Sequence, residues 1–253
     1  MMLKAAKLGI ILAIAVYVSG CRNANSLARE GFKYLEQGKK ITALKYFEEA
    51  LDANKKKPLA LYGKGKIMTE SALTMNLGQK LIESALPKLE KEYKPDAVKS
   101  LAKSYAMENL YSKAIKVLEN ALTDGIHDPG IYLDLSFYTG QILERSKARN
   151  ILRKGIEMNP DASSLYLALS DIDIKQSRDF ALALKSLEKA RQLDPENMEI
   201  LQKTAFVYYN LGNLDKSIEM LNLLKSIQTN STEKLMIDKW ITQVKSRKWQ
   251  INL

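Results

Sequence analysis

One stretch of the chain decides the fold: residues 198–224, which read MEILQKTAFVYYNLGNLDKSIEMLNLL. Apolar residues recur at helical spacing on both sides of Gly212, so the stretch predicts two helices joined by a turn. Ala205 in the first helix and Ser217 in the second are small, and small residues at a crossing point let two helices approach closely. The stretch therefore predicts a helical hairpin.

The same pattern recurs along the chain. A small residue, a large apolar one and another small one, spaced by four and then three, mark each second helix. Copies that begin at Ala114, Ala148 and Ala183 lie 34 and 35 residues apart. A hairpin repeated with this period resembles the tetratricopeptide repeat. The regular copies are Ala43, Phe47 and Ala50; Ala114, Leu118 and Ala121; Ala148, Leu152 and Gly155; and Ala183, Leu187 and Ala190. A less strict copy, in the sixth repeat, is Ser217, Leu221 and Leu224.

The resemblance implies an all-α fold, a tetratricopeptide superhelix or α-solenoid of about six hairpins with a C-terminal capping helix. In the first hairpin we expect Gly31 to face Ala43, with Tyr34 and Phe47 packed around them. A generic helical bundle with chance periodicity is the alternative. The expected parts are a signal peptide at 1–20, a repeat array at 21–231 with repeats at 24–57, 58–94, 95–128, 129–163, 164–197 and 198–231, and a capping helix at 232–253.

The pattern is weakest in the second repeat and ends before the last helix. Gly78 and Ala85 fit only with inserted residues, and Pro87 interrupts the second helix, so we expect a lengthened or kinked hairpin there. Residues 232–252 carry apolar side chains at near-helical spacing, with Trp240 as the expected anchor. Such a helix would cover the open apolar face of the last hairpin.

Residues 1–20 have the layout of a secretory signal peptide, with a basic start and an apolar core at 8–18 that is too short to span a bilayer comfortably. Residues 18–21, VSGC, resemble the bacterial lipobox. The resemblance implies that Cys21 receives diacylglycerol and becomes a lipid anchor. Two alternatives remain: ordinary cleavage after Gly20 that leaves a free thiol, and an uncleaved anchor.

The chain lacks the residues of most familiar hydrolytic chemistry, and an enzyme built on it would need an isolated pair of carboxylates. His127 is its only histidine and Cys21 its only cysteine, so it offers no plausible zinc, iron or copper ligand set and no nucleophile paired with a histidine. Asp124 and Asp128 flank His127, but they fit a turn better than a metal site. We expect no enzyme activity, no metal and no cofactor other than the lipid on Cys21.

A partner-binding groove is expected on the first helices of the hairpins, which line the concave surface in the repeats that this chain resembles. The second, fifth, ninth and twelfth positions of each repeat give a lining of apolar, aromatic and lysine side chains. The alternative is that the aromatics pack between hairpins and the lysines are only solvated. The candidates are Phe32, Leu35, Tyr62, Lys66, Lys99, Lys103, Leu133, Phe137, Leu165, Ile172, Lys175, Gln202, Phe206 and Tyr209.

This lining suits an envelope protein or peptide with apolar anchors and acidic groups. The net charge of +10, from 39 Lys and Arg against 29 Asp and Glu, also suits anionic lipid head groups. A two-carboxylate clamp like that of chaperone-binding relatives is not expected, because the asparagine at the ninth position of that clamp is absent from every repeat. Nucleic acid is not expected, because export would separate the protein from it.

These features predict a non-catalytic, membrane-anchored scaffold in cell-envelope assembly. A lipobox followed by about six repeats resembles the type IV pilus pilotins, which help an outer-membrane secretin to insert or assemble. The alternative is a ligand- or substrate-binding lipoprotein that works with a transporter, for which an enclosed apolar pocket is the expected mark. Arg22 stands where some inner-membrane lipoproteins carry aspartate, which favours the periplasmic face of the outer membrane.

Overall fold

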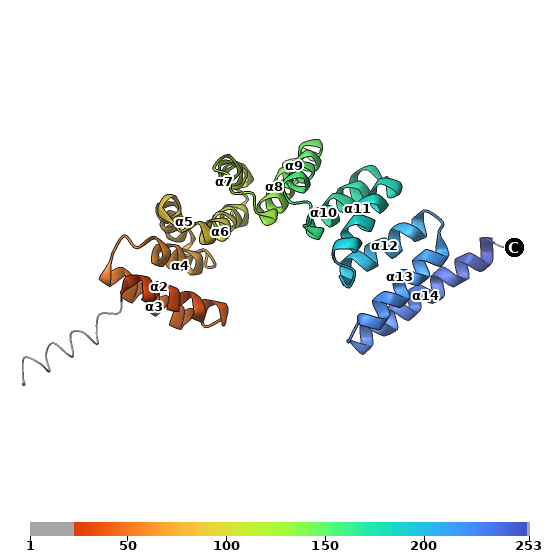
Figure 1. The fold of residues 1–253 in the computed structure, drawn as a ribbon, viewed down its shortest axis with the longest axis horizontal. Coiled ribbons are helices and arrows are strands. Elements are labelled where there is room, and N and C mark those ends of the chain that lie inside the picture. Colours follow the sequence, from red (N-terminus) through yellow and green to blue (C-terminus); the bar gives the residue numbers. More distant parts are fainter. Residues whose placement is uncertain (1–22, 252–253) are drawn as a thin grey trace, which may run out of the picture. The chain divides into compact units, whose positions relative to one another are not determined.

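The computed structural model describes residues 23–251, and every regular element in that range is a helix (Figure 1). The all-α prediction is therefore confirmed. The expected signal peptide and Cys21 lie outside the described residues. The chain divides into two compact units, the first ending at Val117 and the second beginning at Leu118.

The first unit stacks helical hairpins. Helix α2 packs on α3, α4 packs on α5, and the first helices α2, α4 and α6 contact one another in turn. Two short 3₁₀ turns, η1 and η2, precede α6, and the boundary between the two units falls within α7. The helices are α2 (Ala24–Glu36), α3 (Lys40–Ala53), α4 (Pro58–Met68), α5 (Met75–Ala85), η1 (Leu86–Lys88), η2 (Lys91–Tyr93), α6 (Lys94–Met107) and α7 (Tyr111–Thr123).

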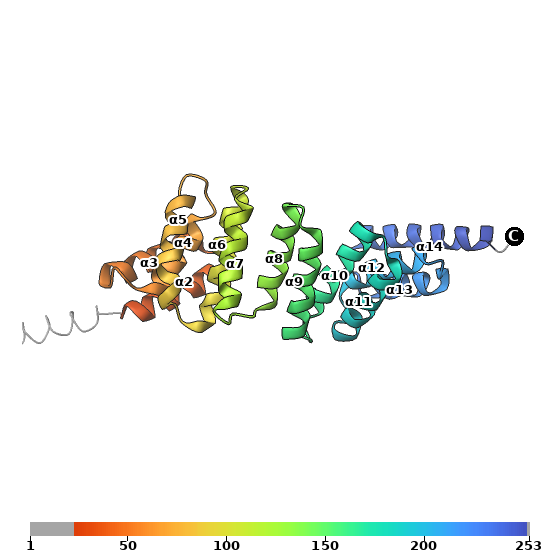
Figure 2. The ribbon, with the colours of Figure 1, turned by 90° about the horizontal axis from the view of Figure 1, so that it is seen from above.

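The second unit continues with three hairpins and a long last helix. Helix α8 packs on α9, α10 on α11 and α12 on α13, and α14 lies along α13 (Figure 2). A π-helical turn, η3, follows α10. The helices are α8 (Pro129–Gln141), α9 (Arg145–Met158), α10 (Ser163–Ile172), η3 (Asp173–Ser177), α11 (Phe180–Leu193), α12 (Met198–Asn210), α13 (Leu214–Ile227) and α14 (Ser231–Ile251).

The starts of these helices follow from local chemistry. Pro58 and Pro129 open α4 and α8, where a fixed φ suits the first helical position and the missing N–H has no partner to lose. Asn197 caps α12 by accepting hydrogen bonds from the backbone N–H groups of Glu199 and Ile200. The residues that the repeat pattern places between hairpins therefore act as helix starts.

Phe47 on α3 is the centre of the first unit. Its ring is fully buried and lies against two glycines, Gly31 on α2 and Gly63 on α4. A Cβ added at Gly31 would lie 2.6 Å from Cε1 of Phe47, and one added at Gly63 would lie closer still to Cζ. The sequence predicts Gly31 against Ala43, but the aromatic ring occupies that place, because only glycine leaves room for it.

The second hairpin departs from the regular pattern, in agreement with its sequence. Its helices cross where Gly65 and Gly78 meet: a Cβ at Gly65 would lie 2.8 Å from the carbonyl oxygen of Gly78. Helix α5 ends at Ala85, and Pro87 falls in the 3₁₀ turn that follows. Two backbones in contact leave no side chain that could move aside, so both positions require glycine.

Five of the turns between the helices of a hairpin contain a residue in the left-handed conformation, and the α4/α5 turn does not. Where glycine occupies this position the conformation costs little, but an L residue loses about 1–2 kcal/mol there. Leu143 has φ of 66° and is 76% exposed, so its side chain contributes little packing in return. The positions are Gly38 in α2/α3, Asn109 in α6/α7, Leu143 in α8/α9, Arg178 in α10/α11 and Gly212 in α12/α13.

We expect Leu143→Gly to stabilise the second unit by about 0.5–1 kcal/mol, because the relieved strain exceeds the extra chain entropy of glycine. Thermal unfolding followed by circular dichroism should show a Tm higher by roughly 2 °C. The reciprocal variant Gly212→Leu, which puts strain into a turn with φ of 78°, should lower the Tm. A lower Tm for Leu143→Gly would contradict this account of the turn.

Candidate functional site

Most of the candidate residues line three hollows. The first lies between α4 and α6, the second among α8, α9 and α10, and the third among α12, α13 and α14. We call them the N-terminal hollow, the middle hollow and the C-terminal hollow. Nine candidates line them: Lys66 and Lys103 the first, Leu133, Phe137, Ile172 and Lys175 the second, and Gln202, Phe206 and Tyr209 the third.

The C-terminal hollow has a volume of about 280 Å³ and lies among α12, α13 and α14. Its buried lining is small or aliphatic, and the aromatic rings of Phe206, Tyr209 and Trp240 also line it. The ring of Phe206 is 50% exposed, so the hollow is open to a partner. The other lining residues are Gln202, Ala205, Ser217, Leu221, Gln243 and Val244.

The middle hollow, of about 310 Å³, lies among α8, α9, α10 and the π turn. Phe137 is its large aromatic residue and is 61% exposed. Asp171, also in the lining, binds Lys203 Nζ at 2.5 Å and lies 3.9 Å from Lys175 Nζ. This hollow therefore combines an exposed ring with a carboxylate whose charge is already balanced.

The N-terminal hollow is polar. Its lining includes Lys66, Ser100, Lys103 and Ser104, with a volume of about 250 Å³. Lys66 forms an ion pair with Asp96 on the next first helix. Because Lys66 is engaged in this way, the exposed Lys103 is the more accessible cation of this hollow.

The contact between α4 and α6 is a hydrogen-bonded cluster around Asp96. Tyr62 and Lys66, both on α4, donate hydrogen bonds to its carboxylate. Burial alone would raise the pKa of Asp96, but these two hydrogen bonds and the nearby positive charges lower it. Burial, followed by the negative charge of Asp96, raises the pKa of Tyr62. The cluster therefore holds one first helix to the next.

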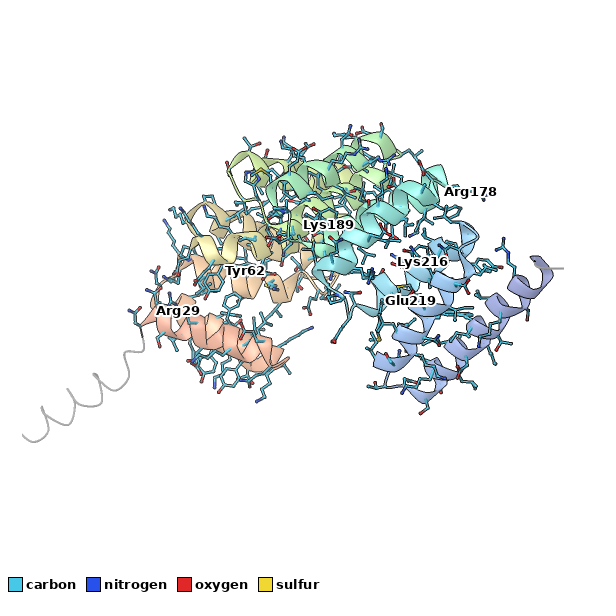
Figure 3. The ribbon with its side chains drawn as sticks, turned by 45° about the vertical axis from the view of Figure 1, so that its right-hand side comes forward. Arg29, Tyr62, Arg178, Lys189, Lys216 and Glu219 are labelled. Carbon is cyan, nitrogen blue, oxygen red and sulfur yellow. The ribbon has the colours of Figure 1, made fainter. Side chains whose placement is uncertain are left out.

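Three candidates are buried, so their expected place on a binding surface is corrected. Tyr62, labelled in Figure 3, and Leu165 are fully buried, and Phe32 is 9% exposed. The ring of Phe32 packs 5.2 Å from that of Phe47 and 5.4 Å from that of Tyr62. These side chains stack hairpins on each other and present little area to a partner. Leu35 and Lys99 are half-buried and line none of the three hollows.

Sequence reasoning treated α14 as a cover and missed its part in a hollow. Trp240 is half-buried and lines the C-terminal hollow together with Gln243 and Val244. The spacing of three and four residues already places these side chains on one face of a helix. That spacing is the signal that could have found them.

A buried ion pair in the second unit has no counterpart in the sequence prediction. Asp173, the first residue of the π turn, has a fully buried side chain, and Arg149 Nη2 on α9 lies 2.5 Å from its Oδ1. Burial raises the pKa of Asp173, and the positive charge of Arg149 opposes that rise. The turn ends at Arg178, labelled in Figure 3, with φ of 49°. The pair therefore joins the π turn to the preceding hairpin.

Within residues 23–251, the structure shows no group of three or more His, Cys, Asp or Glu side chains that could hold a metal ion. A ring nitrogen of His127, the only histidine of the sequence, lies 2.9 Å from the hydroxyl of Tyr132, so this side chain has a hydrogen-bond partner within the protein. In the same range, none of the helices has both the length and the apolar character needed to cross a membrane.

The stacked hairpins and their open hollows define an array of helical repeats. Residues 175–233 match the family model of the tetratricopeptide repeat, and solved structures share the fold of this chain. Cellulose synthase operon protein C of Pseudomonas fluorescens (strain SBW25) is 33% identical over 91 residues, which are 36% of this chain and 7% of that protein. The match thus spans a small fraction of this relative's length.

Three solved structures illustrate the shared fold. Pseudomonas aeruginosa pilF has a TM-score of 0.65 at 16% identity, covering 85% of this chain and 96% of that one. YrrB, described as having an unusual peptide-binding site, has a TM-score of 0.51 at 17% identity and covers 76% and 97%. Yeast Tom70 has a TM-score of 0.66 at 16% identity and covers 90% and 48%. At these identities the likeness is one of fold alone.

Proposed function

We propose that the chain is a non-catalytic scaffold that binds partner proteins or peptides in the hollows of its first helices. The observation that carries the proposal is the pair Phe137 and Phe206, which are 61% and 50% exposed. They occupy the same place in the middle and C-terminal hollows, 69 residues apart. Large exposed aromatic side chains over apolar hollows are typical of binding hot spots.

We further propose that the scaffold works in cell-envelope assembly, such as pilus or secretin biogenesis, held to the membrane by a lipid on Cys21. The lipobox-like residues 18–21 support the anchor. The role in cell-envelope assembly is supported by the sequence similarity to cellulose synthase operon protein C and by the fold shared with pilF. A transporter-linked ligand-binding lipoprotein requires an enclosed apolar pocket, and the exposure of Phe137 and Phe206 favours the scaffold.

The double variant Phe137→Ala/Phe206→Ala should lose its partner. Each truncation of a hot-spot aromatic costs about 1–2 kcal/mol of binding, so recovery after mild crosslinking and capture from membranes should fall by tenfold or more. The matched control is Leu73→Ala, which removes a 97% exposed apolar side chain outside the hollows. Recovery of the same envelope proteins by the double variant would count against the proposal, provided that circular dichroism shows an unchanged fold.

A further inference from the structure

Helix α14 stands in the place that the first helix of a further hairpin would take. In the middle hollow, α10 contributes Ala168, Asp171 and Ile172; in the C-terminal hollow, α14 contributes Trp240, Gln243 and Val244, each 72 residues later. Ile237, Ile241 and Val244 of α14 are buried in the core formed with α12 and α13, and Trp240 packs against that core. The last helix therefore covers the core and, with Trp240, Gln243 and Val244 at the edge of that contact, also completes a hollow.

The two hollows of the second unit are lined from corresponding positions of the repeat, but some of these positions carry different residues. Ser136 and Leu152 in the middle hollow correspond to Ala205 and Leu221 in the C-terminal hollow, 69 residues later. Two of the differences between the linings add an aromatic ring: Tyr209 stands in place of Gly140, and Trp240 stands in place of Ala168. The C-terminal hollow thus has three aromatic residues where the middle hollow has Phe137 as its single ring. The C-terminal hollow is therefore better suited than the middle hollow to bind an apolar side chain.

A positive charge, that of Arg247, lies next to the C-terminal hollow against its lining residue Tyr209. The guanidinium of Arg247 lies 4.3 Å from the centre of the Tyr209 ring, and Nη1 donates a hydrogen bond of 3.4 Å to the carbonyl oxygen of Tyr209. Arg247 corresponds to Lys175 of the middle hollow, which lies 3.9 Å from Asp171 four residues before it. The residue four before Arg247 is Gln243, which is neutral.

The charge of Arg247 is therefore available to a partner. Among the residues that the structure describes, no carboxylate lies within ion-pair distance of Arg247, and no acidic residue lines this hollow. Stacking on Tyr209 holds the guanidinium in place, so it loses little freedom on binding a carboxylate. Because Arg247 stacks on Tyr209, its charge lies next to the apolar lining of the hollow.

We propose that the C-terminal hollow is a specificity pocket for a partner segment in which a large apolar side chain stands next to a carboxylate. The apolar side chain packs against Phe206, Tyr209 and Trp240, and the carboxylate pairs with Arg247. A volume of about 280 Å³ lies just below the usual range for small-molecule sites, about 300–1,000 Å³, and suits a side chain better than a cofactor. The proposal rests on the scaffold function and names the chemistry that one of its hollows selects.

A display library of random heptapeptides, selected on the purified full chain, tests this pairing. Wild-type protein should enrich peptides with Phe, Trp, Leu or Met within two residues of Asp, Glu or a free C-terminal carboxylate. Arg247→Glu should abolish the acidic preference and lower recovery of the wild-type peptides by about tenfold. Arg247→Lys should keep the preference, and Lys245→Glu should change nothing, because Lys245 is exposed on the same helix outside the hollow.

The outcomes separate this inference from the scaffold function. Enriched peptides without acidic groups, or an acidic preference that survives in Arg247→Glu, would overturn the inference. If binding then depends on Phe137 and not on Arg247, the scaffold function stands and the pocket assignment falls. If the chain enriches no peptide above an empty support, both are refuted. Thermal unfolding of each variant identifies any that fails to fold, and Arg247→Lys, which keeps the charge, then decides the case.

Discussion

Replacing Phe47 by alanine should lower the free energy of unfolding of the first unit by about 3–5 kcal/mol, the range for a fully buried aromatic residue. The ring is 0% exposed and fills the space between Gly31 and Gly63. Neither glycine has a side chain that could move into the cavity, so relaxation should recover little. Thermal unfolding should show the Tm of this unit lowered by more than about 10 °C.

Phe206→Ala is the matched control for this prediction. It removes the same atoms from a ring that is 50% exposed, and it should therefore cost less than about 1 kcal/mol. A second check uses Gly63→Ala, whose added Cβ would enter the space of the Phe47 ring. Combined with Phe47→Leu, it should cost less than the two single changes together. Equal losses for Phe47→Ala and Phe206→Ala would refute the central role of Phe47.

Arg149→Met should destabilise the second unit by about 3 kcal/mol at pH 7, because it removes one partner of a buried ion pair and leaves the other in place. The side chain of Asp173 is 0% exposed and lies 2.5 Å from Arg149, which is 24% exposed. Methionine keeps much of the apolar stem of arginine, so the loss reports the charge. Urea unfolding measures it.

The effect of pH on this variant has a definite sign. Burial already raises the pKa of Asp173 in the folded protein, and Arg149 opposes the rise, so removing Arg149 raises the pKa further. A carboxyl group with a raised folded-state pKa contributes stability below its unfolded pKa of about 3.9 and loses it as the pH rises through the folded pKa. The deficit of Arg149→Met should therefore shrink as the pH falls from 7 toward 4.5.

Arg153→Met provides the matched control. Arg153 also lowers the pKa of Asp173 through its charge, but its side chain is exposed. Screening by water should keep its effect below about 1 kcal/mol. A deficit of Arg149→Met that stays constant from pH 7 to 4.5, or that grows as the pH falls, would show that lost packing and not the buried charge causes the instability.

The sequence was sufficient for the hairpins because their determinants are local. The small residues at 205 and 217 and glycine at 212 specify two helices and a turn within one repeat, and repetition multiplies the signal. The same reasoning predicted that Gly31 contacts Ala43. The spacing of small residues indicates which helices meet, but it does not indicate which side chain fills the space between them. The ring of Phe47 fills the space next to Gly31 because it also packs against Gly63 of the next hairpin.

The candidate site was less predictable, because it depends on distances between repeats. Tyr62 and Leu165 occupy the expected positions on first helices, yet neighbouring hairpins bury them. The ion pair of Asp173 and Arg149 joins residues 24 positions apart on different hairpins, and no periodicity marks it. By contrast, Phe137 and Phe206 are exposed in their hollows, and their part in binding stays a prediction.

The ring shared by Gly31 and Gly63 also bears on how the first unit opens. In a repeat protein, neighbouring hairpins open independently unless the interface between them is strong. Phe47 belongs to the first hairpin and packs on the second, so neither can unravel without exposing its ring to water. We therefore expect the two hairpins to open as one cooperative element, with backbone amides that become exchangeable together.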